Sequence, residues 1–382
     1  MAKNIIFVFP SMGIGGTTVS TRNLISLLGK DGYDCLVMPL NPEGVLTHLY
    51  DDVKQVKTPF FVRALSVSGW KKMPTIPQKI VAAFFRFLCH HCQYFERRVI
   101  GKCLDKIIKK YDIDTVVACQ EGISTRLVSY AGTKSTVAWV RCDYKRWITD
   151  IGIDRETHYN VFKAIVCVAD QTCESFKEVF PEYVDKTFCI ANPQDSDLII
   201  SRANNDEAEP RFITSDNTIV SIGRLDAIKR FDQIAPIARQ LKERGLHFHW
   251  YLVGDGAERE RIKASIAENG VEENVIMLGA KTNPYFYIKR ADALVCLSRS
   301  EACPRVINEA KVLHTPTIST DYPSIYEFIT DGETGIISTL KDMPDTIMRL
   351  LTDNGLRELI NNNISSFEFD NTELMCRIKE IL

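Results

Sequence analysis

Residues 291–320 read ADALVCLSRSEACPRVINEAKVLHTPTIST. The run from 292 to 297 is short and apolar, as is typical of a buried strand, and a second such run follows at 315–319. The residues at 305–313 have the length and apolar spacing of an amphipathic helix. A strand, a helix and a second strand in this order predict one unit of a parallel sheet covered by helices.

The same alternation extends in both directions and forms two series. The first predicts strands at 4–9, 34–38, 114–118, 136–140, 164–168 and 187–190, and helices at 17–30, 77–111, 122–131, 155–162 and 171–179. The second predicts strands at 218–222, 247–253, 274–278, 292–297, 315–319 and 335–337, and helices at 231–244, 257–268, 284–290, 305–313, 324–329, 341–352 and 355–364. The stretch 77–111 is long enough for two helices. A polar, acidic segment, 195–216, is interpreted as a linker or exposed loop.

A chain of 382 residues suits two domains better than one core. We expect two Rossmann-like, doubly wound α/β domains, at 1–195 and 196–370. Ligands of such sheets bind at the carboxyl ends of the strands, where the strand order reverses. The expected active site is therefore the cleft between the two domains, with the acceptor bound by the first.

The composition, 45% hydrophobic and 25% charged, is that of a globular protein. No apolar run approaches the roughly 18 to 20 residues that span a bilayer, and the first run, 5–9, is too short for a signal peptide. We therefore expect a cytoplasmic protein, in which the twelve scattered cysteines are buried thiols. No metal site is expected at Cys-His-His-Cys, residues 89–92, because adjacent helical side chains point in different directions.

Basic residues concentrate in the segment 54–110. It carries thirteen lysines and arginines and two acids, a net charge of +11, which leaves −13 on the rest of the chain. Aromatic residues are interleaved with the cations: Phe60, Phe61, Trp70, Phe84, Phe85, Phe87, Tyr94 and Phe95. This combination favours an anionic membrane surface as a partner; a solvated basic face over core aromatics is the alternative. Nucleic acid is not expected, because no binding motif accompanies the charge.

A glycine-rich loop, residues 13–16, follows the first predicted strand and precedes a helix. Glycines let the backbone approach a ligand, and a helix start offers N–H groups to an anion. The loop does not match a dinucleotide-binding fingerprint, because the third glycine of that motif would fall at Thr18. Gly15 and Gly16 are therefore candidates for a phosphate- or sugar-facing loop, with a tight strand–helix turn as the alternative.

A second candidate begins where the predicted strand 218–222 ends. Gly223 turns the chain, and two cations, Arg224 and Lys229, follow. Cations there can clamp a diphosphate and stabilise the charge on a leaving nucleotide. A solvated basic helix start is the alternative, although helix N-termini disfavour cations unless an anion is present.

The opening stretch supplies the third candidate. Its loop presents Glu301, and Pro304 is expected to start the helix, where a missing N–H costs nothing. The N–H groups around Val306 and Ile307 then form an anion site for a diphosphate. Glu301 is placed to accept a hydrogen bond from a sugar hydroxyl, and Glu309 from a ribose hydroxyl. A surface loop with an acidic first turn is the alternative.

Together these motifs resemble the retaining GT-B glycosyltransferases of the large group 1 family. The resemblance is strong from about residue 218 to 338 and weaker in the first half, where the glycine loop and Asn192-Pro193 fit. It rests on the order and spacing of these segments: Gly223-Arg224-Leu225 with Lys229, Gly254-Asp255-Gly256, Asn283-Pro284-Tyr285, Glu301 and Glu309, residues 316–321 (PTISTD) and residues 331–335 (DGETG).

The resemblance implies a GT-B fold and metal-independent, cofactor-free transfer from a nucleotide-diphosphate sugar with retention at the anomeric carbon. A UDP-sugar is expected ahead of a GDP-sugar, and the acceptor would be a saccharide or a lipid-linked molecule at the inner membrane face, in cell-surface polysaccharide or glycolipid synthesis. Arg224 and Lys229 would stabilise the departing diphosphate, Glu301 would hold the donor sugar and Glu309 the ribose. The other donor-binding candidates are Gly15, Gly16, Gly223, Gly254, Asp255, Cys303, Pro304, Val306 and Ile307. A final helix, 371–382, would return to the N-terminal domain.

One departure from the family pattern concerns Arg141. Many relatives carry a histidine near the sugar in a stretch that matches Trp139–Tyr144, and Arg141 stands in its place. Arginine cannot act as a general base near neutral pH. Arg141 would instead contact the donor sugar or phosphate, and Asp143 could take over part of the role; a surface or salt-bridged arginine is the alternative.

Two other readings stay open. A nucleotide-sugar epimerase of the same architecture is one, and the pairs Arg224 with Lys229 and Glu301 with Glu309 favour the transferase over it. A non-catalytic, nucleotide-sugar-binding partner of another glycosyltransferase is the second, and Arg141 is the feature that encourages it. Slow hydrolysis of a nucleotide-sugar would separate a transferase from a pure binder.

Overall fold

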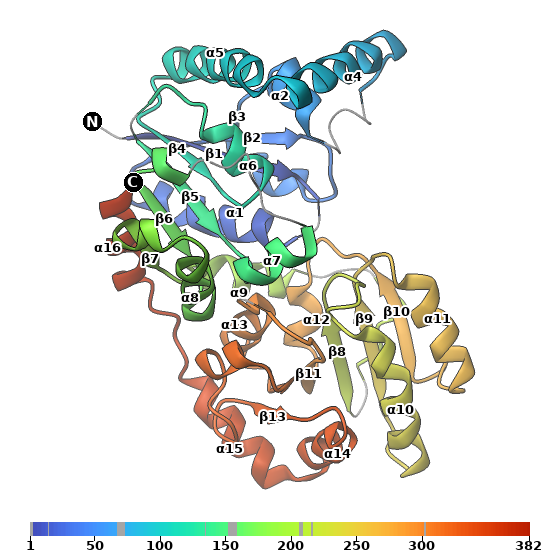
Figure 1. Ribbon diagram of the computed structural model, residues 1–382. Coiled ribbons are helices and arrows are strands. Elements are labelled where there is room, and N and C mark those ends of the chain that lie inside the picture. Colours follow the sequence, from blue (N-terminus) through green and yellow to red (C-terminus); the bar gives the residue numbers. More distant parts are fainter. Residues whose placement is uncertain are drawn as a thin grey trace. The chain divides into compact units, whose positions relative to one another are not determined.

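Figure 1 shows the computed structural model, which describes residues 3–13, 15–66, 73–133, 135–151, 159–205, 209–214, 217–301 and 303–382. The chain forms two compact units: unit 1 comprises Met1–Pro193 and Asn371–Leu382, and unit 2 comprises Gln194–Asp370. The sequence places the domain boundary after residue 195, close to this division. Among the described residues, no helix is both long enough and apolar enough to cross a membrane.

Unit 1 contains a seven-stranded sheet in the order β3-β2-β1-β4-β5-β6-β7, in which every neighbouring pair is parallel. Its strands are β1 (Asn4–Ser11), β2 (Asp34–Asn41), β3 (Lys54–Gln55), β4 (Thr115–Ala118), β5 (Thr136–Val140), β6 (Ala164–Cys167) and β7 (Thr187–Cys189). Its helices are α1 (Gly16–Lys30), α2 (Phe60–Leu65), α4 (Ile76–His91), α5 (Gln93–Tyr111), α6 (Ile123–Val128), α7 (Tyr144–Ile151), α8 (Asp170–Val179) and α16 (Thr372–Ile381). Short 3-10 turns are η1 (Thr47–Tyr50), η2 (Tyr159–Val161) and η3 (Pro181–Lys186).

Unit 2 contains a six-stranded parallel sheet in the order β10-β9-β8-β11-β12-β13. Its strands are β8 (Thr218–Ile222), β9 (His249–Val253), β10 (Val275–Gly279), β11 (Ala293–Cys296), β12 (Thr317–Thr320) and β13 (Ile336–Ser338). Its helices are α9 (Ser196–Asn204), α10 (Ile234–Glu243), α11 (Arg259–Glu268), α12 (Tyr285–Lys289), α13 (Arg305–Val312), α14 (Met343–Thr352) and α15 (Asn354–Ser365), with 3-10 turns η4 (Phe231–Gln233) and η5 (Pro323–Glu327).

Helices cover both faces of the unit 2 sheet, so successive strand residues enter different cores. On β9, Trp250 and Leu252 pack with α10, α11 and α14, whereas Tyr251 and Val253 pack with α9, α12 and α13. All four side chains are almost fully buried, because alternate residues of a strand point to opposite faces. A strand buried on both faces is a continuous run of apolar residues, and such a run is easily recognised in the sequence.

The structure differs from the sequence prediction in several local elements. The segment 195–216, predicted as a linker, contains α9, whose first turn is capped where the Asp195 carboxylate accepts a hydrogen bond from the Leu198 N–H. The stretch 77–111 forms two helices, which meet at Cys92. Of the predicted helix 155–162, residues 152–158 lie outside the described residues and 159–161 form η2. The elements α2, α7 and β3 were not predicted from the sequence.

Candidate active site

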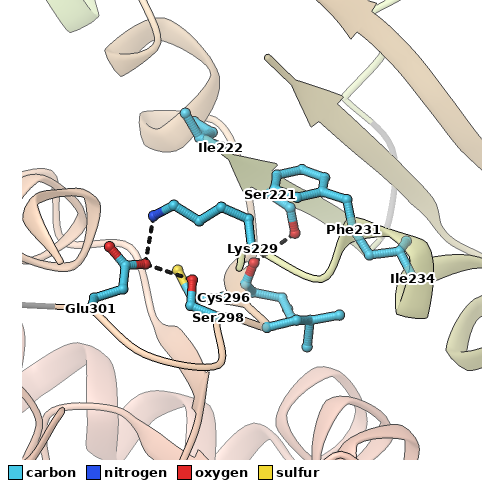
Figure 2. Close-up of a pocket in the computed structure, with 10 residues that line it drawn as sticks. Ser221, Ile222, Lys229, Phe231, Ile234, Cys296, Ser298 and Glu301 are labelled. Carbon is cyan, nitrogen blue, oxygen red and sulfur yellow. Dashed lines mark hydrogen bonds and ion pairs between the residues drawn. The ribbon is translucent and has the colours of Figure 1, made fainter. Parts of the chain in front are cut away.

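A pocket opens in unit 2 where the strand order reverses. β8 and β11 are neighbours in the sheet, although β9 and β10 lie between them in the sequence. The pocket is small and lies at the carboxyl ends of these two strands (Figure 2). Its lining residues are Ser221, Ile222, Lys229, Phe231, Ile234, Val295, Cys296, Leu297, Ser298 and Glu301. This is the position at which open α/β sheets bind their ligands.

Lys229 and Glu301 meet in this pocket. The Lys229 ammonium lies 2.6 Å from Oε1 of Glu301, and the Ser298 hydroxyl donates a hydrogen bond of 2.6 Å to the same oxygen. The Ser324 hydroxyl donates to the main-chain carbonyl of Glu301 and so fixes the loop that carries it. The side chains of Lys229 and Glu301 are 19% and 13% exposed, so the two charges lie close together at the edge of the protein interior.

The loop between β8 and η4, called the β8 loop, carries Lys229. The Asp226 carboxylate accepts a hydrogen bond from the Lys229 N–H, which closes the loop. A side chain at Gly223 would lie 3.6 Å from Cδ and Cε of Lys229, in ordinary contact. Arg230 has a left-handed backbone with φ 52°, an uncommon conformation that turns the chain into η4.

Arg224 lies apart from the pocket lining. Its guanidinium is paired with Asp226 at 3.2 Å, and its side chain is 63% exposed. An exposed pair of this kind contributes little to stability. The structure thus brings Lys229 and Glu301 together, whereas the side chain of Arg224, on the same loop, is exposed to solvent.

The glycines after β9 are explained by close backbone contacts. A Cβ atom at Gly254 would lie 1.8 Å from the Gly223 carbonyl oxygen, and one at Gly256 would lie 2.4 Å from that of Leu225. The Leu225 N–H donates to the Asp255 carbonyl, which holds the two loops against each other. Gly254 and Asp255, predicted to bind the donor, therefore support the loop that carries Lys229.

Glu309 lies in a buried charged cluster that was not predicted from the sequence. It forms an ion pair with Arg305, and the two side chains are 5% and 14% exposed. Burial, followed by the Glu309 carboxylate, raises the pKa of Tyr285. Burial lowers the pKa of the Arg305 guanidinium, but Glu309, with smaller contributions from Tyr285 and Cys303, outweighs burial, and the pKa is raised. The four-residue spacing of Arg305 and Glu309 on a predicted helix is the signal that could have revealed the pair.

The start of α13 differs from its prediction. Pro304 is the residue before the helix, and Arg305 is the first residue within it. The Ile307 N–H donates to the Pro304 carbonyl and the Arg305 N–H to that of Cys303. The Ile307 N–H, expected to face a phosphate, is therefore already bonded within the first turn.

A cysteine of the pocket is held protonated. Burial, followed by the Glu301 carboxylate, raises the pKa of Cys296 to about 12. A thiol is a nucleophile only as its thiolate. Cys296 therefore lines the pocket as a protonated thiol.

Arg141, which follows β5, connects the segments after β4 and β7 with helix α1. Its Nε donates to the Cys119 carbonyl at 2.6 Å, and its Nη1 donates to the Ser20 hydroxyl at 2.8 Å and to the Asn192 side chain. Its own N–H donates to the Glu121 carboxylate at 2.8 Å. A guanidinium with a fixed fork of donors suits such a clamp. Within unit 1, the Arg141 guanidinium thus donates to a main-chain carbonyl and to two uncharged side chains.

The other unit 1 candidates stand at helix starts. Gly15 is the residue before α1, and Gly16 is the first residue within it. Asp143 precedes α7: its Oδ1 accepts from the Arg146 N–H at 3.2 Å and from the Ser175 hydroxyl at 2.6 Å. Asp143 therefore caps α7 and connects it to α8.

Comparisons with known proteins find a family model that matches most of unit 2. The family model described as "Glycosyl transferases group 1" matches residues 203–366, which include the pocket and α13. The chain is 29% identical over 190 residues to an alpha-D-kanosaminyltransferase of Streptomyces kanamyceticus, over 48% of each chain. It is 27% identical over 151 residues to an N-acetylgalactosamine-N,N'-diacetylbacillosaminyl-diphospho-undecaprenol 4-alpha-N-acetylgalactosaminyltransferase of Campylobacter jejuni, over 38% of this chain and 40% of that protein.

These alignments span about half or less of the curated relatives' length. A crystal structure of Anabaena HepE in complex with UDP and glucose is similar over 99% of this chain and 98% of that one, with a TM-score of 0.72 and 16% identity. At that identity the likeness concerns the fold. Most of unit 2 therefore matches the model of the glycosyl transferases group 1 family, and the two units together have the fold of GT-B glycosyltransferases.

Proposed function

We propose that this chain is a glycosyltransferase that transfers a sugar from a nucleotide-diphosphate sugar to a saccharide or lipid-linked acceptor. The observation that carries the proposal is the pairing of Lys229 with Glu301 in the pocket at the carboxyl ends of β8 and β11. That pocket lies within the residues matched by the family model.

The two side chains have complementary roles in this proposal. An ammonium group carries three donors and no acceptor, so Lys229 would bind the diphosphate and stabilise the charge that develops as it leaves. Glu301 would then accept hydrogen bonds from sugar hydroxyls. The exposed guanidinium of Arg224 would add a second cation to the diphosphate, and Glu309 would hold the ribose.

The donor and stereochemistry are further parts of the proposal. A UDP-sugar is proposed ahead of a GDP-sugar, in keeping with the UDP bound in the HepE structure. The names of both curated relatives state an alpha linkage. An alpha product formed from an alpha-linked nucleotide-sugar means retention at the anomeric carbon, and we propose retention here.

The acceptor and location follow the same line. The Campylobacter relative acts on an undecaprenol-linked saccharide, as its name states. We propose an acceptor of this class, used in cell-surface polysaccharide or glycolipid synthesis. The protein would work in the cytoplasm, at the inner face of the membrane, with the segment 54–110 against the anionic surface. No metal or cofactor is part of the proposal.

The first experiment is a thermal-shift screen of the full chain with UDP, GDP, ADP and CMP, each with and without EDTA. A ligand that binds the native state alone raises the melting temperature by mass action. We expect a rise with UDP that EDTA leaves unchanged and that Glu309→Ala reduces. No rise with any nucleotide would contradict the donor site.

Turnover separates the remaining readings. A transferase should release UDP from the preferred donor, and proton NMR of the product should show the anomeric configuration of the donor. A protein that binds the donor without turnover would be a non-catalytic partner. One that converts the sugar without releasing it would be an epimerase.

A further inference from the structure

Helix α4 of unit 1 presents an apolar stripe on its exposed side. Ile76, Ile80, Phe84 and Phe87 are 74%, 64%, 62% and 58% exposed. Their spacing of three and four residues places them on one face of a helix. Such a row of large, solvent-facing apolar side chains is unusual on a protein surface and marks an interaction site.

The opposite side of α4 is already packed. Ala82, Phe85 and Cys89 are buried in the unit 1 core, and the Phe85 ring lies 4.7 Å from that of Phe61 in α2, between ring centres. The helix therefore has an inner face that holds it to unit 1 and an outer face that has no role in that core. Its outer residues are available to an external partner.

The charge around the stripe is of one sign. No Asp or Glu occurs between residues 54 and 95, and the carboxylate of Glu96 is buried and paired with Arg126. Helix α5 follows α4 along one side of unit 1 (Figure 1). Its exposed cations are Arg97, Arg98, Lys102, Lys106, Lys109 and Lys110, against one exposed acid, Asp105.

We propose that the outer face of α4 inserts into the surface of a bilayer with anionic headgroups, while the cations of α5 contact those headgroups. An amphipathic helix with aromatic and aliphatic residues on one face and basic residues beside it lies in the membrane interface in this way. A nucleic acid would engage the cations but would leave the apolar stripe in water.

This assignment deepens the proposed function, on whose membrane-bound acceptor it rests, by naming the face that reaches the lipid. Phe84 and Phe87 would enter the boundary between headgroups and acyl chains. The attachment would keep unit 1 beside an acceptor whose lipid part stays in the bilayer. Trp70, Lys71 and Lys72 of the predicted basic-aromatic segment lie outside the described residues and are not needed for the argument.

The test is co-sedimentation of the full chain with phosphatidylcholine vesicles that contain or lack phosphatidylglycerol, at low and high salt. The variants are Phe84→Ser with Phe87→Ser, and Lys102→Glu with Lys106→Glu. Leu359→Ser is the matched control, because Leu359 is 50% exposed on α15 of unit 2. We expect the wild type and Leu359→Ser to bind the anionic vesicles.

The phenylalanine variant should partition about tenfold less strongly or worse, and the lysine variant should lose the salt-sensitive part of the binding. Absence of wild-type binding, or binding that the phenylalanine variant retains, would overturn the proposal. The proposal would also be overturned if light scattering showed that the phenylalanine variant loses a dimer while its vesicle binding is unchanged. The apolar stripe of α4 would then be covered by a second copy of the chain.

The UDP-induced thermal shift of each variant separates this proposal from the proposed function. The phenylalanine variant should keep the wild-type shift, because both side chains are exposed and lie in unit 1. Vesicle binding without any UDP shift in the wild type would leave the membrane face standing and remove the donor site. A UDP shift without vesicle binding would support the donor site and overturn the membrane face.

Discussion

The Lys229 ammonium lies 2.6 Å from the Glu301 carboxylate, although the two residues are 72 positions apart in the chain. Each is brought there by the loop that follows its own strand, β8 for Lys229 and β11 for Glu301. The carboxyl ends of neighbouring parallel strands meet at one edge of the sheet, so the strand order of unit 2 creates the pair.

Loss of the Lys229 ammonium should abolish most of the transfer. Lys229→Met is expected to lower the rate by about 100-fold or more, since it removes a charge aimed at the leaving diphosphate. The matched control is Lys263→Met, at an exposed position of α11, which should behave as the wild type. The measurement is the initial rate of UDP release, and equal rates for the two variants would refute the role.

The buried pair of Arg305 and Glu309 should be sensitive to the loss of one partner. Arg305→Met leaves the Glu309 carboxylate buried without its cation and should lower the free energy of unfolding by about 3 kcal/mol or more. Arg305→Met with Glu309→Gln should recover most of that loss. The measurement is urea unfolding of the full chain.

An exposed pair of the same spacing provides the control. Arg239 and Glu243 are 56% and 59% exposed, and Arg239→Met should cost at most about 0.5 kcal/mol. Similar losses for Arg239→Met and Arg305→Met would mean that burial does not strengthen the Arg305 pair.

Acid should weaken unit 2 through Glu209. The hydrogen bonds from Arg211, followed by those from Lys281, lower the pKa of Glu209 from 4.5 to about 2. A carboxyl group whose pKa is lower in the folded state stabilises the fold above its ordinary pKa. This contribution is complete above pH 4.5 and is lost as the pH falls toward about 2.

The check compares the free energy of unfolding of the wild type and Glu209→Gln across that range. Their difference should shrink as the pH falls. Glu260→Gln, at an exposed position of α11, should show little difference at any pH. A gap for Glu209→Gln that stays constant with pH would contradict the assignment.

A side chain at Gly254 should disturb the β8 loop. In Gly254→Ala the new Cβ would lie 1.8 Å from the Gly223 carbonyl oxygen, so the loop before Lys229 must move. We expect a stability loss of about 1–3 kcal/mol and a smaller UDP-induced thermal shift. In Gly29→Ala no atom lies near the new Cβ, and this helix variant should be as stable as the wild type or more so. A normal UDP shift in Gly254→Ala would show that the loop tolerates the displacement.

Replacing Arg141 with histidine should destabilise unit 1. Arg141→His removes the bonds to the Cys119 carbonyl and the Ser20 hydroxyl and should lower the free energy of unfolding by about 1–3 kcal/mol. Arg97→His, at an exposed position of α5, is the control and should unfold as the wild type does. An Arg141→His variant of full stability and altered donor affinity would instead assign Arg141 to the donor.

The sequence by itself determined the two series of parallel strands and the order of the motifs. Strands such as 292–297 are buried on both faces, so they appear as apolar runs whatever surrounds them. The first glycine loop and the Glu301 loop could be placed because each follows such a run. The α7 and α9 helices were not predicted. Both are short, and the first turn of each is capped by a carboxylate, that of Asp143 for α7 and that of Asp195 for α9.

Only the tertiary structure decided what each candidate contacts. In the folded chain Lys229 pairs with Glu301, and Arg224 is exposed. Gly254 lies so close to the Gly223 carbonyl that a side chain there would clash with it. The tertiary structure also bonded the Ile307 N–H inside its own helix turn and buried Arg305 against Glu309. Strand order and loop geometry bring these residues into contact. A sequence pattern shows which polar groups are present, but it does not show which of them already have a hydrogen-bond or ion-pair partner elsewhere in the chain.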